Sequence, residues 1–404
     1  MMAAERPLDL WSAEKIRGPL SAEKGQGLLN SPADDIPLSR PEIDVYTIRR
    51  LAETVRYVRA NSVFYRGLFA GQEELELPAD GRSTDPQTAE HPLDPQTMEH
   101  PLDPQTAADF MDRFHRLPFT YPADLQKRHM DFLCVHPSEI SRIVTQQTSG
   151  STGLPKRIFF TEADQELTVD FFDHGMRFIV DETDTVLILM PAKMPGSIGR
   201  LLGEGLRRLG ARPIEYGIPG DPEQGKSLDE ELQSILELME REHVTSAVAL
   251  PVHMRMLAQK NDRGLEMRSV LLSADYVPEE DCRSIEDSFG CRIYEHYGMT
   301  EMGLGCAVSC GQGRGYHIRE TDLFIEIVDP ASGEVITDET PGEIVFTTLT
   351  RKGMPFVRYR TGDISRWVLQ ECPCGSMLRR LDKVQLRNVI KGMLAGASLA
   401  GRGY

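Results

Sequence analysis

The sequence predicts an α/β protein whose sheets are largely parallel, with a smaller antiparallel β subdomain. From Leu117 onward, short apolar strands alternate with amphipathic helices, which is typical of a parallel sheet covered by helices. After Gly303 the apolar residues recur at every second position between turn residues, as in antiparallel strands. Because a chain of 404 residues exceeds a single typical core, more than one lobe is expected.

Apolar spacing predicts the individual elements. A helix is expected over residues 43–69, where apolar residues recur at helical spacing. Thr161-Glu-Ala-Asp164 has the form of a capping box, which predicts a helix that begins there and runs through Phe172. Other helices are expected over 197–209, 229–242 and 279–289, strands over 158–160, 186–190, 211–218, 246–250 and 269–272, and antiparallel strands over 323–328 and 343–348 within a subdomain of about 320–370.

A proline-rich segment of nine residues is repeated before this alternation begins. Asp85-Pro-Gln-Thr-Ala-Glu-His-Pro-Leu93 recurs with one change over 94–102, and Asp103-Pro-Gln-Thr106 begins a third copy. The repeat has too little apolar content to pack, so we expect a flexible surface insertion over about 72–106. Histidine is a common metal ligand, and the repeat contains His91 and His100, but a solvated loop is the preferred interpretation.

The charge balance and the termini exclude some classes of partner. A net charge of −17 argues against a nucleic acid or an anionic membrane surface, because both need a basic footprint. No segment reaches the ~18 apolar residues of a membrane span, and the first residues lack an apolar signal region. A cytoplasmic protein is therefore expected, with its cysteines as thiols or metal ligands. Cys134, Cys282 and Cys291 are expected in the core.

The segment Thr148-Ser-Gly-Ser-Thr-Gly-Leu-Pro-Lys156 combines hydroxyl side chains, glycines and a lysine. Glycine lets the backbone approach a ligand closely, and free N–H groups with hydroxyls form a concavity for anionic oxygens. The lysine adds a point charge suited to phosphate. The spacing differs from the P-loop pattern, and an ordinary polar loop explains this segment equally well by itself. Its interpretation therefore depends on the motifs that follow.

Three polar clusters lie downstream. Ser273-Ala-Asp275 follows a buried strand, at the position where ligands of open α/β sheets gather. Tyr294-Glu-His-Tyr-Gly-Met-Thr-Glu301 follows a strand-like segment, and Pro355-Phe-Val-Arg-Tyr-Arg-Thr-Gly-Asp363 has a carboxylate after a turn glycine. Each cluster alone is also compatible with a structural turn or loop.

In this order and spacing, the four clusters resemble the adenylate-forming superfamily, specifically its phenylacetate–coenzyme A ligase branch, from about Phe64 to roughly Arg380. The resemblance implies an AMP-binding (adenylation) core over residues 1–380. It implies a loop that wraps the ATP phosphates, a segment that lines the adenine, a motif that borders the adenine and the acyl pocket, and a carboxylate that binds the ribose. The implied nucleotide-binding residues are Thr148, Ser149, Gly150, Ser151, Thr152, Gly153, Lys156, Ser273, Ala274, Asp275, Glu295, His296, Tyr297, Gly298, Met299, Thr300 and Asp363.

The resemblance also implies a reaction, the ATP-dependent activation of a carboxylic acid, such as the aryl acid phenylacetate, to acyl-AMP and then transfer to coenzyme A. A carboxylate oxygen attacks the α-phosphorus while charge builds on the departing pyrophosphate, so catalysis rests on positioning and charge neutralisation. Thr148, Lys156 and Glu301 are the catalytic candidates, and Glu301 is a hard oxygen ligand suited to Mg²⁺. The acyl pocket has as candidates Met194, Pro195, Ile198 and Tyr297, although core packing explains each equally well.

A structural zinc ion is the second predicted site. Cys310 and His317 lie close in sequence, and Cys372-Pro-Cys374 has two thiolates on a tight turn, which together form a tetrahedral Cys₃His set. Buried cysteines are the alternative, but the same pattern occurs in many members of the ligase branch. A site with four protein ligands leaves no position for substrate. Cys306 is a spare thiol that could replace Cys310.

The resemblance ends near the C-terminus. Members of the branch continue as a mobile lid that assists adenylation and builds the coenzyme A tunnel, whereas residues 381–404 are expected to be a hinge remnant and a frayed tail. Without a lid, turnover is expected to suffer more than nucleotide binding. The hypotheses are an acid–coenzyme A ligase whose lid is shortened or supplied by another chain, an adenylating enzyme with another acceptor, and a nucleotide-binding protein without catalysis. A homodimer is also compatible, since dimers are common among related ligases.

Overall fold

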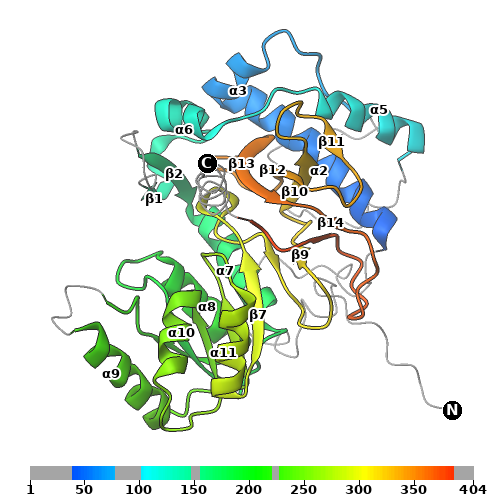
Figure 1. Ribbon diagram of the computed structural model, residues 1–404. Helices are drawn as coiled ribbons and strands as arrows, with labels where there is room; N and C mark the ends of the chain where they lie inside the picture. Colours follow the sequence, from blue (N-terminus) through cyan, green and yellow to red (C-terminus); the bar gives the residue numbers. More distant parts are fainter. Residues whose placement is uncertain (1–38, 78–101, 147–154, 221–226, 386–404) are drawn as a thin grey trace, which may run out of the picture. The chain divides into compact units, whose positions relative to one another are not determined.

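The computed structural model describes residues 39–77, 102–146, 155–220 and 227–385 (Figure 1). The chain forms two compact units. The first unit contains the chain up to Asp164 with 300–302 and 318–380, and the second contains 165–299 with 303–317 and the chain from Leu381. In these ranges, no helix combines the length and apolar character that crossing a membrane requires.

The first unit begins with helices that pack around an antiparallel sheet. The predicted helix over 43–69 is two helices, because Ser62 has an extended backbone and its hydroxyl accepts the N–H of Tyr65 at 3.3 Å. The helices of this unit are α2 (Arg40–Asn61), α3 (Val63–Leu68), α5 (Pro104–His115) and α6 (Pro122–Arg128), with short 3-10 turns at His129–Phe132, Pro137–Glu139 and Thr300–Met302.

The start of α5 corrects the predicted insertion. Asp103 and Pro104, which begin the third copy of the repeat, are the N-cap and first residue of a helix instead of a flexible loop. The Asp103 carboxylate accepts the N–H of Thr106 at 3.0 Å, and proline suits the first helical position because its missing N–H would have no partner there. Phe110 and Phe114 anchor this helix in the core. The first two copies, with His91 and His100, lie outside the described residues.

The predicted antiparallel subdomain is a four-stranded sheet in the order β11-β10-β12-β13. In the central pair, Leu323 lies opposite Thr348 and Val328 lies opposite Glu343, and both strands are buried along their length. A separate hairpin forms from two antiparallel strands before this sheet. These strands are β1 (Ile140–Gln146), β2 (Lys156–Thr161), β10 (Leu323–Val328), β11 (Val335–Ile336), β12 (Gly342–Thr348) and β13 (Tyr359–Ser365), while β14 (Trp367–Val368) is not a member of this four-stranded sheet.

The second unit confirms the predicted α/β fold with a largely parallel sheet. Its strands lie in the order β8-β7-β6-β5-β3-β4, and all neighbours pair in parallel except β7 with β8. The strands are β3 (Thr185–Leu189), β4 (Arg212–Glu215), β5 (Ser246–Ala249), β6 (Ser269–Leu272), β7 (Arg292–Tyr297) and β8 (Ala307–Val308). The helices are α7 (Glu162–Met176), α8 (Ile198–Leu209), α9 (Leu228–Arg241), α10 (Pro251–Gln259) and α11 (Glu279–Phe289). The chain passes between the units within α7, β9 (Tyr316–Ile318) and β15 (Arg380–Leu381).

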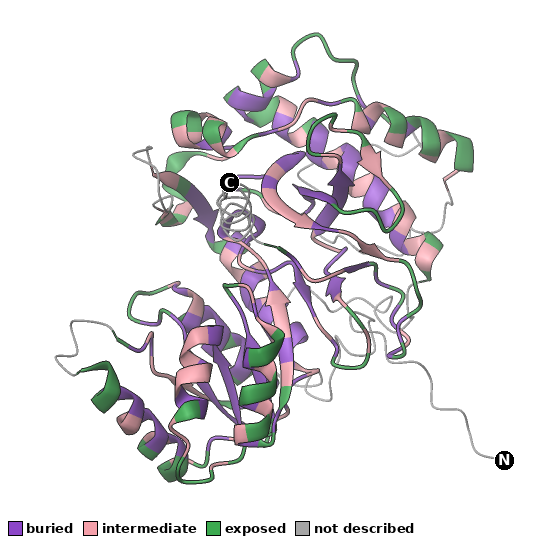
Figure 2. Ribbon diagram, viewed as in Figure 1, coloured by how far each residue is buried: buried purple, intermediate pink, exposed green. Residues whose placement is uncertain are grey.

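Alternation along the strands divides the core of the second unit between two faces of the sheet. One face packs Leu187, Val270 and Leu272 against α9, α10 and α11. Val248 and Leu271 point to the opposite face, since successive side chains of a strand alternate, and there they meet residues of α7 and α8. Figure 2 shows these strands buried and the outer sides of the helices exposed. The second face is the one that holds a cavity.

The predicted capping box at the start of α7 is confirmed, and it supports a stability prediction. Asp164 and Thr161 exchange backbone-to-side-chain hydrogen bonds of 3.0 and 3.1 Å. The same buried carboxylate accepts the N–H groups of Lys352 at 2.8 Å and Gly353 at 3.0 Å. Asp164→Ala would leave these N–H donors buried without an acceptor, so we expect the free energy of unfolding to fall by about 3 kcal/mol. Urea unfolding measures this loss.

The neighbouring exposed Glu162 supplies the control for this prediction. Glu162→Ala is expected to change the free energy of unfolding by less than about 0.5 kcal/mol. Equal losses in the two variants would contradict the role given to the Asp164 carboxylate.

Candidate functional site

The hairpin of β1 and β2 holds the ends of the predicted phosphate loop. Gln146 and Lys156 lie directly opposite each other in its antiparallel register. The loop residues Thr148, Ser149, Gly150, Ser151, Thr152 and Gly153 lie outside the described residues. The two strands therefore place both ends of the predicted loop in the first unit, and Lys156 begins β2.

Lys156 forms an ion pair with Glu301, which is only 3% exposed. The hydroxyl of Tyr359 donates to the same oxygen, Oε1, at 3.2 Å. The other carboxylate oxygen, Oε2, is buried and has no hydrogen-bond partner among the residues that the structure describes. Such an orphaned oxygen is costly unless a ligand or cation joins it. The next residue back, Thr300, accepts a hydrogen bond from the Gln146 amide, which ties the motif to the end of β1.

Asp363, the predicted ribose ligand, lies half-buried in β13 of the same unit. Its N–H donates to the Thr361 hydroxyl at 3.0 Å. The preceding Gly362 has a φ of +81°, a conformation that favours glycine, and its N–H donates to Glu343 at 2.9 Å. The first unit therefore contains Lys156, Thr300, Glu301 and Asp363 of the predicted set.

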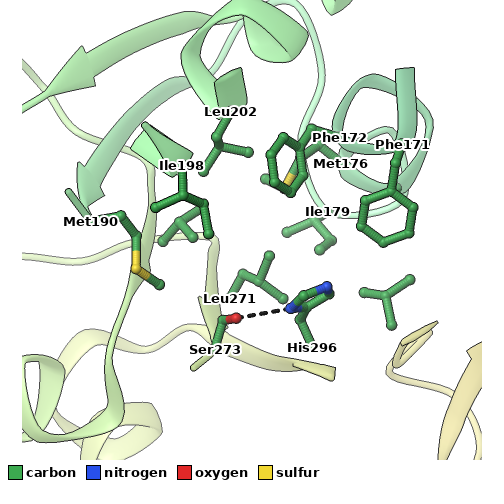
Figure 3. A pocket seen from close by; sticks show the side chains of 13 residues that line it. Phe171, Phe172, Met176, Ile179, Met190, Ile198, Leu202, Leu271, Ser273 and His296 are labelled. Atoms are coloured by element: carbon green, nitrogen blue, oxygen red, sulfur yellow. Dashed lines mark hydrogen bonds between the residues drawn. The ribbon is translucent and has the colours of Figure 1, made fainter. Parts of the chain in front are cut away.

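The predicted adenine and acyl motifs lie at the carboxyl ends of β6 and β7 in the second unit. These strands are parallel neighbours, with Leu272 opposite Glu295, so their ends meet at one edge of the sheet. Ser273 follows β6 and its hydroxyl lies 2.8 Å from Nδ1 of His296 (Figure 3). The structure thus joins two predicted residues that lie 23 positions apart.

The residues beside this pair have different environments. Ala274 has a φ of +71°, and both Ala274 and Asp275 are exposed, so this turn lies at the surface of the second unit. Glu295 is engaged by two groups of its own unit, since Tyr316 donates to it at 2.9 Å and Lys383 pairs with it at 3.2 Å. Tyr297 is buried, and Met299 and Gly298 are half-buried at the end of the strand.

An apolar cavity of about 30 Å³ lies beside the Ser273–His296 pair. Ser273 and His296 are the two hydrogen-bonding side chains among the residues that line it, and the others are apolar side chains and a glycine. Figure 3 shows the lining side chains converging from α7, α8 and the sheet. The lining residues that were not predicted as site residues include Phe171, Phe172, Met176, Leu202 and Leu271.

Only part of the predicted acyl pocket lines this cavity. Ile198 does, whereas Met194 is 70% exposed, and neither Pro195 nor Tyr297 is among the lining residues. The adjacent aromatic residues Phe171 and Phe172 on a predicted helix were the available signal. It was weak, because such a pair is more often core than a binding site.

Burial controls the state of His296. Removal from water lowers the pKa of its imidazole to about 4, so the ring is neutral at neutral pH. Nδ1 is engaged with Ser273, while Nε2 is buried without a partner in the described ranges. Gly298 leaves room for the ring, since a Cβ at that position would stand 2.8 Å from Cε1 and 3.1 Å from Nε2. Any larger residue at 298 would press on the imidazole.

The predicted zinc ligands form one pair in each unit. In the second unit, the Cys310 sulfur and a ring nitrogen of His317 lie within 4.8 Å of each other, and both residues are buried. In the first unit, the sulfurs of Cys372 and Cys374 also lie within 4.8 Å of each other. These two cysteines lie on a turn in which the N–H of Gly375 donates to the Cys372 carbonyl at 2.9 Å. Cysteine sulfur and histidine nitrogen are the ligand atoms that Zn²⁺ prefers, so both pairs fit a zinc ion. Convergence of the pairs on one ion stays a prediction.

Comparisons with known proteins agree on one family. The AMP-binding enzyme family matches residues 45–349. The chain is similar to a phenylacetate–coenzyme A ligase of Pseudomonas putida, 29% identical over 262 residues, which are 62% of this chain and 56% of the relative. One from Thermus thermophilus is 27% identical over 270 residues, 64% and 58% of the two chains. The chain thus spans less than three fifths of these two relatives.

A solved structure shares the fold. The open conformation of 2-hydroxyisobutyryl-CoA ligase, in complex with 2-HIB-AMP and CoA, matches 84% of this chain and 68% of its own with a TM-score of 0.65. The two sequences are 19% identical, so this likeness shows the fold alone.

Proposed function

The chain belongs to the AMP-binding enzyme family, and from this premise we propose that it activates a carboxylic acid with ATP to acyl-AMP and then transfers the acyl group to coenzyme A. The observation that carries the proposal is the ion pair between Lys156 and the buried Glu301 at the end of the predicted phosphate loop. A cation and a carboxylate with one oxygen that no described residue hydrogen-bonds suit a site where polyphosphate charge must be balanced. The similar phenylacetate–coenzyme A ligases support the same reaction.

In the proposed first step, a carboxylate oxygen of the acid forms a bond to the α-phosphorus, and the bond from that phosphorus to pyrophosphate breaks. Lys156 neutralises charge on the phosphates, together with N–H groups of the loop. Glu301 Oε2 fits Mg²⁺, because it is a hard oxygen without another partner among the described residues. When bound, that ion would help to neutralise the leaving pyrophosphate.

In the proposed second step, the coenzyme A sulfur attacks the acyl carbonyl carbon, and AMP leaves with the electrons of the broken C–O bond. Asp363 would hold the ribose, and Ser273, Ala274 and Asp275 would line the adenine. The cavity beside His296 is the best candidate for the acyl group, since ligands of open α/β sheets bind at the carboxyl ends of strands.

The choice of acid is a finer proposal. Phenylacetate is the first candidate because the similar curated ligases carry that name. A cavity of about 150 Å³ is known to hold benzene, whereas this cavity measures about 30 Å³. An aryl ring would therefore enter only if lining side chains move, and Met176 and Met190 are flexible enough to do so.

Acid-dependent exchange of labelled pyrophosphate into ATP tests the proposal, with a panel of aryl and short aliphatic acids. We expect exchange with at least one acid, followed by thioester formation when coenzyme A is added. Exchange without thioester would indicate another acyl acceptor. ATP binding in calorimetry without exchange would indicate a nucleotide-binding protein, and the absence of both would overturn the proposal.

A further inference from the structure

His296, which lines the cavity, carries one polar atom that the proposed reaction does not use. Nε2 of His296 is buried, and no residue in the described parts of the chain hydrogen-bonds to it. It lies on the side of the ring that faces Phe171, whose ring centroid is 5.7 Å from that of the imidazole (Figure 3). A buried nitrogen surrounded by apolar side chains loses its hydration without compensation. The arrangement therefore favours any ligand that supplies the missing hydrogen bond.

The contacts around His296 indicate which chemical group of a ligand could hydrogen-bond to Nε2. Ser273 holds Nδ1 at 2.8 Å, and which of the two atoms donates depends on the tautomer. Nε2 is then either a donor or an acceptor, and a hydroxyl group can serve both. A carboxylate or an ammonium group fits less well, because burial keeps the imidazole neutral and penalises a second buried charge.

Water is a poor substitute for such a group. The cavity of about 30 Å³ has room for a water molecule, but an ordered buried water needs two to four polar partners. The lining side chains offer Ser273 and His296, and these two already bond to each other. A ligand hydroxyl attached to an apolar body would bring its own apolar contacts and fill this position better.

We propose that His296 is a specificity-determining residue that selects a carboxylic acid with a compact apolar side chain bearing one hydroxyl group. The proposal rests on the proposed function, because it treats the cavity as the acyl pocket. The size of the cavity favours a short aliphatic chain, and the unpartnered Nε2 favours the hydroxylated acid over its deoxy counterpart. Ser273 acts as a positioning residue that fixes the imidazole.

Matched acid pairs test the proposal. We would measure kcat/KM for pyrophosphate exchange with butyrate and its 2-, 3- and 4-hydroxy derivatives, and with phenylacetate and its 3- and 4-hydroxy derivatives. One hydroxy acid is expected to exceed its deoxy partner by about 10-fold or more, since the partner leaves Nε2 unpaired. In His296→Leu that ratio is expected to fall about 10-fold or more. The quantity to compare between variants is the ratio of kcat/KM for the hydroxy acid to kcat/KM for its deoxy partner. A general loss of activity lowers both values alike and leaves this ratio unchanged.

Two further variants keep the test decisive. His296→Gln retains a hydrogen-bonding group and is expected to preserve part of the preference, even if His296→Leu folds poorly. Ile198→Val changes the cavity without changing its hydrogen bonds, so it should alter both acids of a pair alike. Equal kcat/KM values within every pair, or a ratio unchanged in both His296 variants, would overturn the proposal.

Failure of the proposed function can be told apart from failure of this inference. If no acid supports exchange, calorimetry with the same pairs measures binding directly. A hydroxy acid that binds the wild-type chain more tightly than its deoxy partner, with the difference reduced in His296→Leu, would still support the inference. Binding of neither acid, or equal binding of both, would overturn it.

Discussion

Glu301→Gln is expected to lower acid-dependent pyrophosphate exchange about 100-fold or more. The substitution removes the charge that pairs with Lys156 and replaces one carboxylate oxygen by an amide nitrogen, which cannot bind Mg²⁺. Oε2 is buried without a partner among the described residues, so its free oxygen is available to a cation rather than to the fold. The loss should therefore appear in turnover at saturating ATP, with a shift of the Mg²⁺ concentration at half-maximal rate.

The pairing of Lys156 with Glu301 gives a sharper version of this test. Lys156→Met should also reduce exchange, and the double variant should lose less than the product of the two single losses, because paired residues are not independent. Glu334→Gln, an exposed carboxylate of the same unit, is the matched control and should keep wild-type exchange. A folded Glu301→Gln variant with exchange within about threefold of wild type would refute the role of this residue.

The secondary structure was predictable where local signals are strong. Helix α11 and strand β6 begin and end at the predicted residues, because apolar spacing and turn residues mark both limits. Helix α10 was missed although Leu250 and Pro251 start it with a proline at the first position. The predicted eight-residue strand over 211–218 was too long, since the pairing with β3 ends at Glu215.

The motifs in the sequence indicate which residues belong to the candidate site, but not which of these residues contact one another. The pair of Lys156 and Glu301 spans 145 positions, and the sequence gives no information about which residues meet across that separation. Ser273 and His296 meet only because β6 and β7 are parallel neighbours in a particular register. Both residues were predicted as nucleotide-binding from motif order, whereas the cavity beside them depends on how α7 and α8 cover the sheet.

The largest stability effect is expected at the predicted zinc ligands. The purified chain should contain about one zinc ion, and Cys372→Ser with Cys374→Ser should remove it. Structural zinc sites contribute to folding outright, and in a chain of 404 residues the loss of about 3 kcal/mol lowers the melting temperature by about 4 °C. Metal analysis together with thermal unfolding, before and after a strong chelator, measures both effects.

The matched controls distinguish zinc ligands from the other cysteines, of which Cys282 is half-buried instead of lying in the core as predicted. Cys282→Ser should retain zinc, because Cys282 lies outside both ligand pairs. Cys306→Ser tests the alternative ligand, and it should also retain zinc, since Cys310 is the cysteine grouped with His317 in the described structure. Zinc lost from Cys306→Ser and kept in Cys310→Ser would reverse that assignment. If all variants lack zinc like the wild type, the four residues are core thiols and a buried imidazole, and the Cys₃His prediction is wrong.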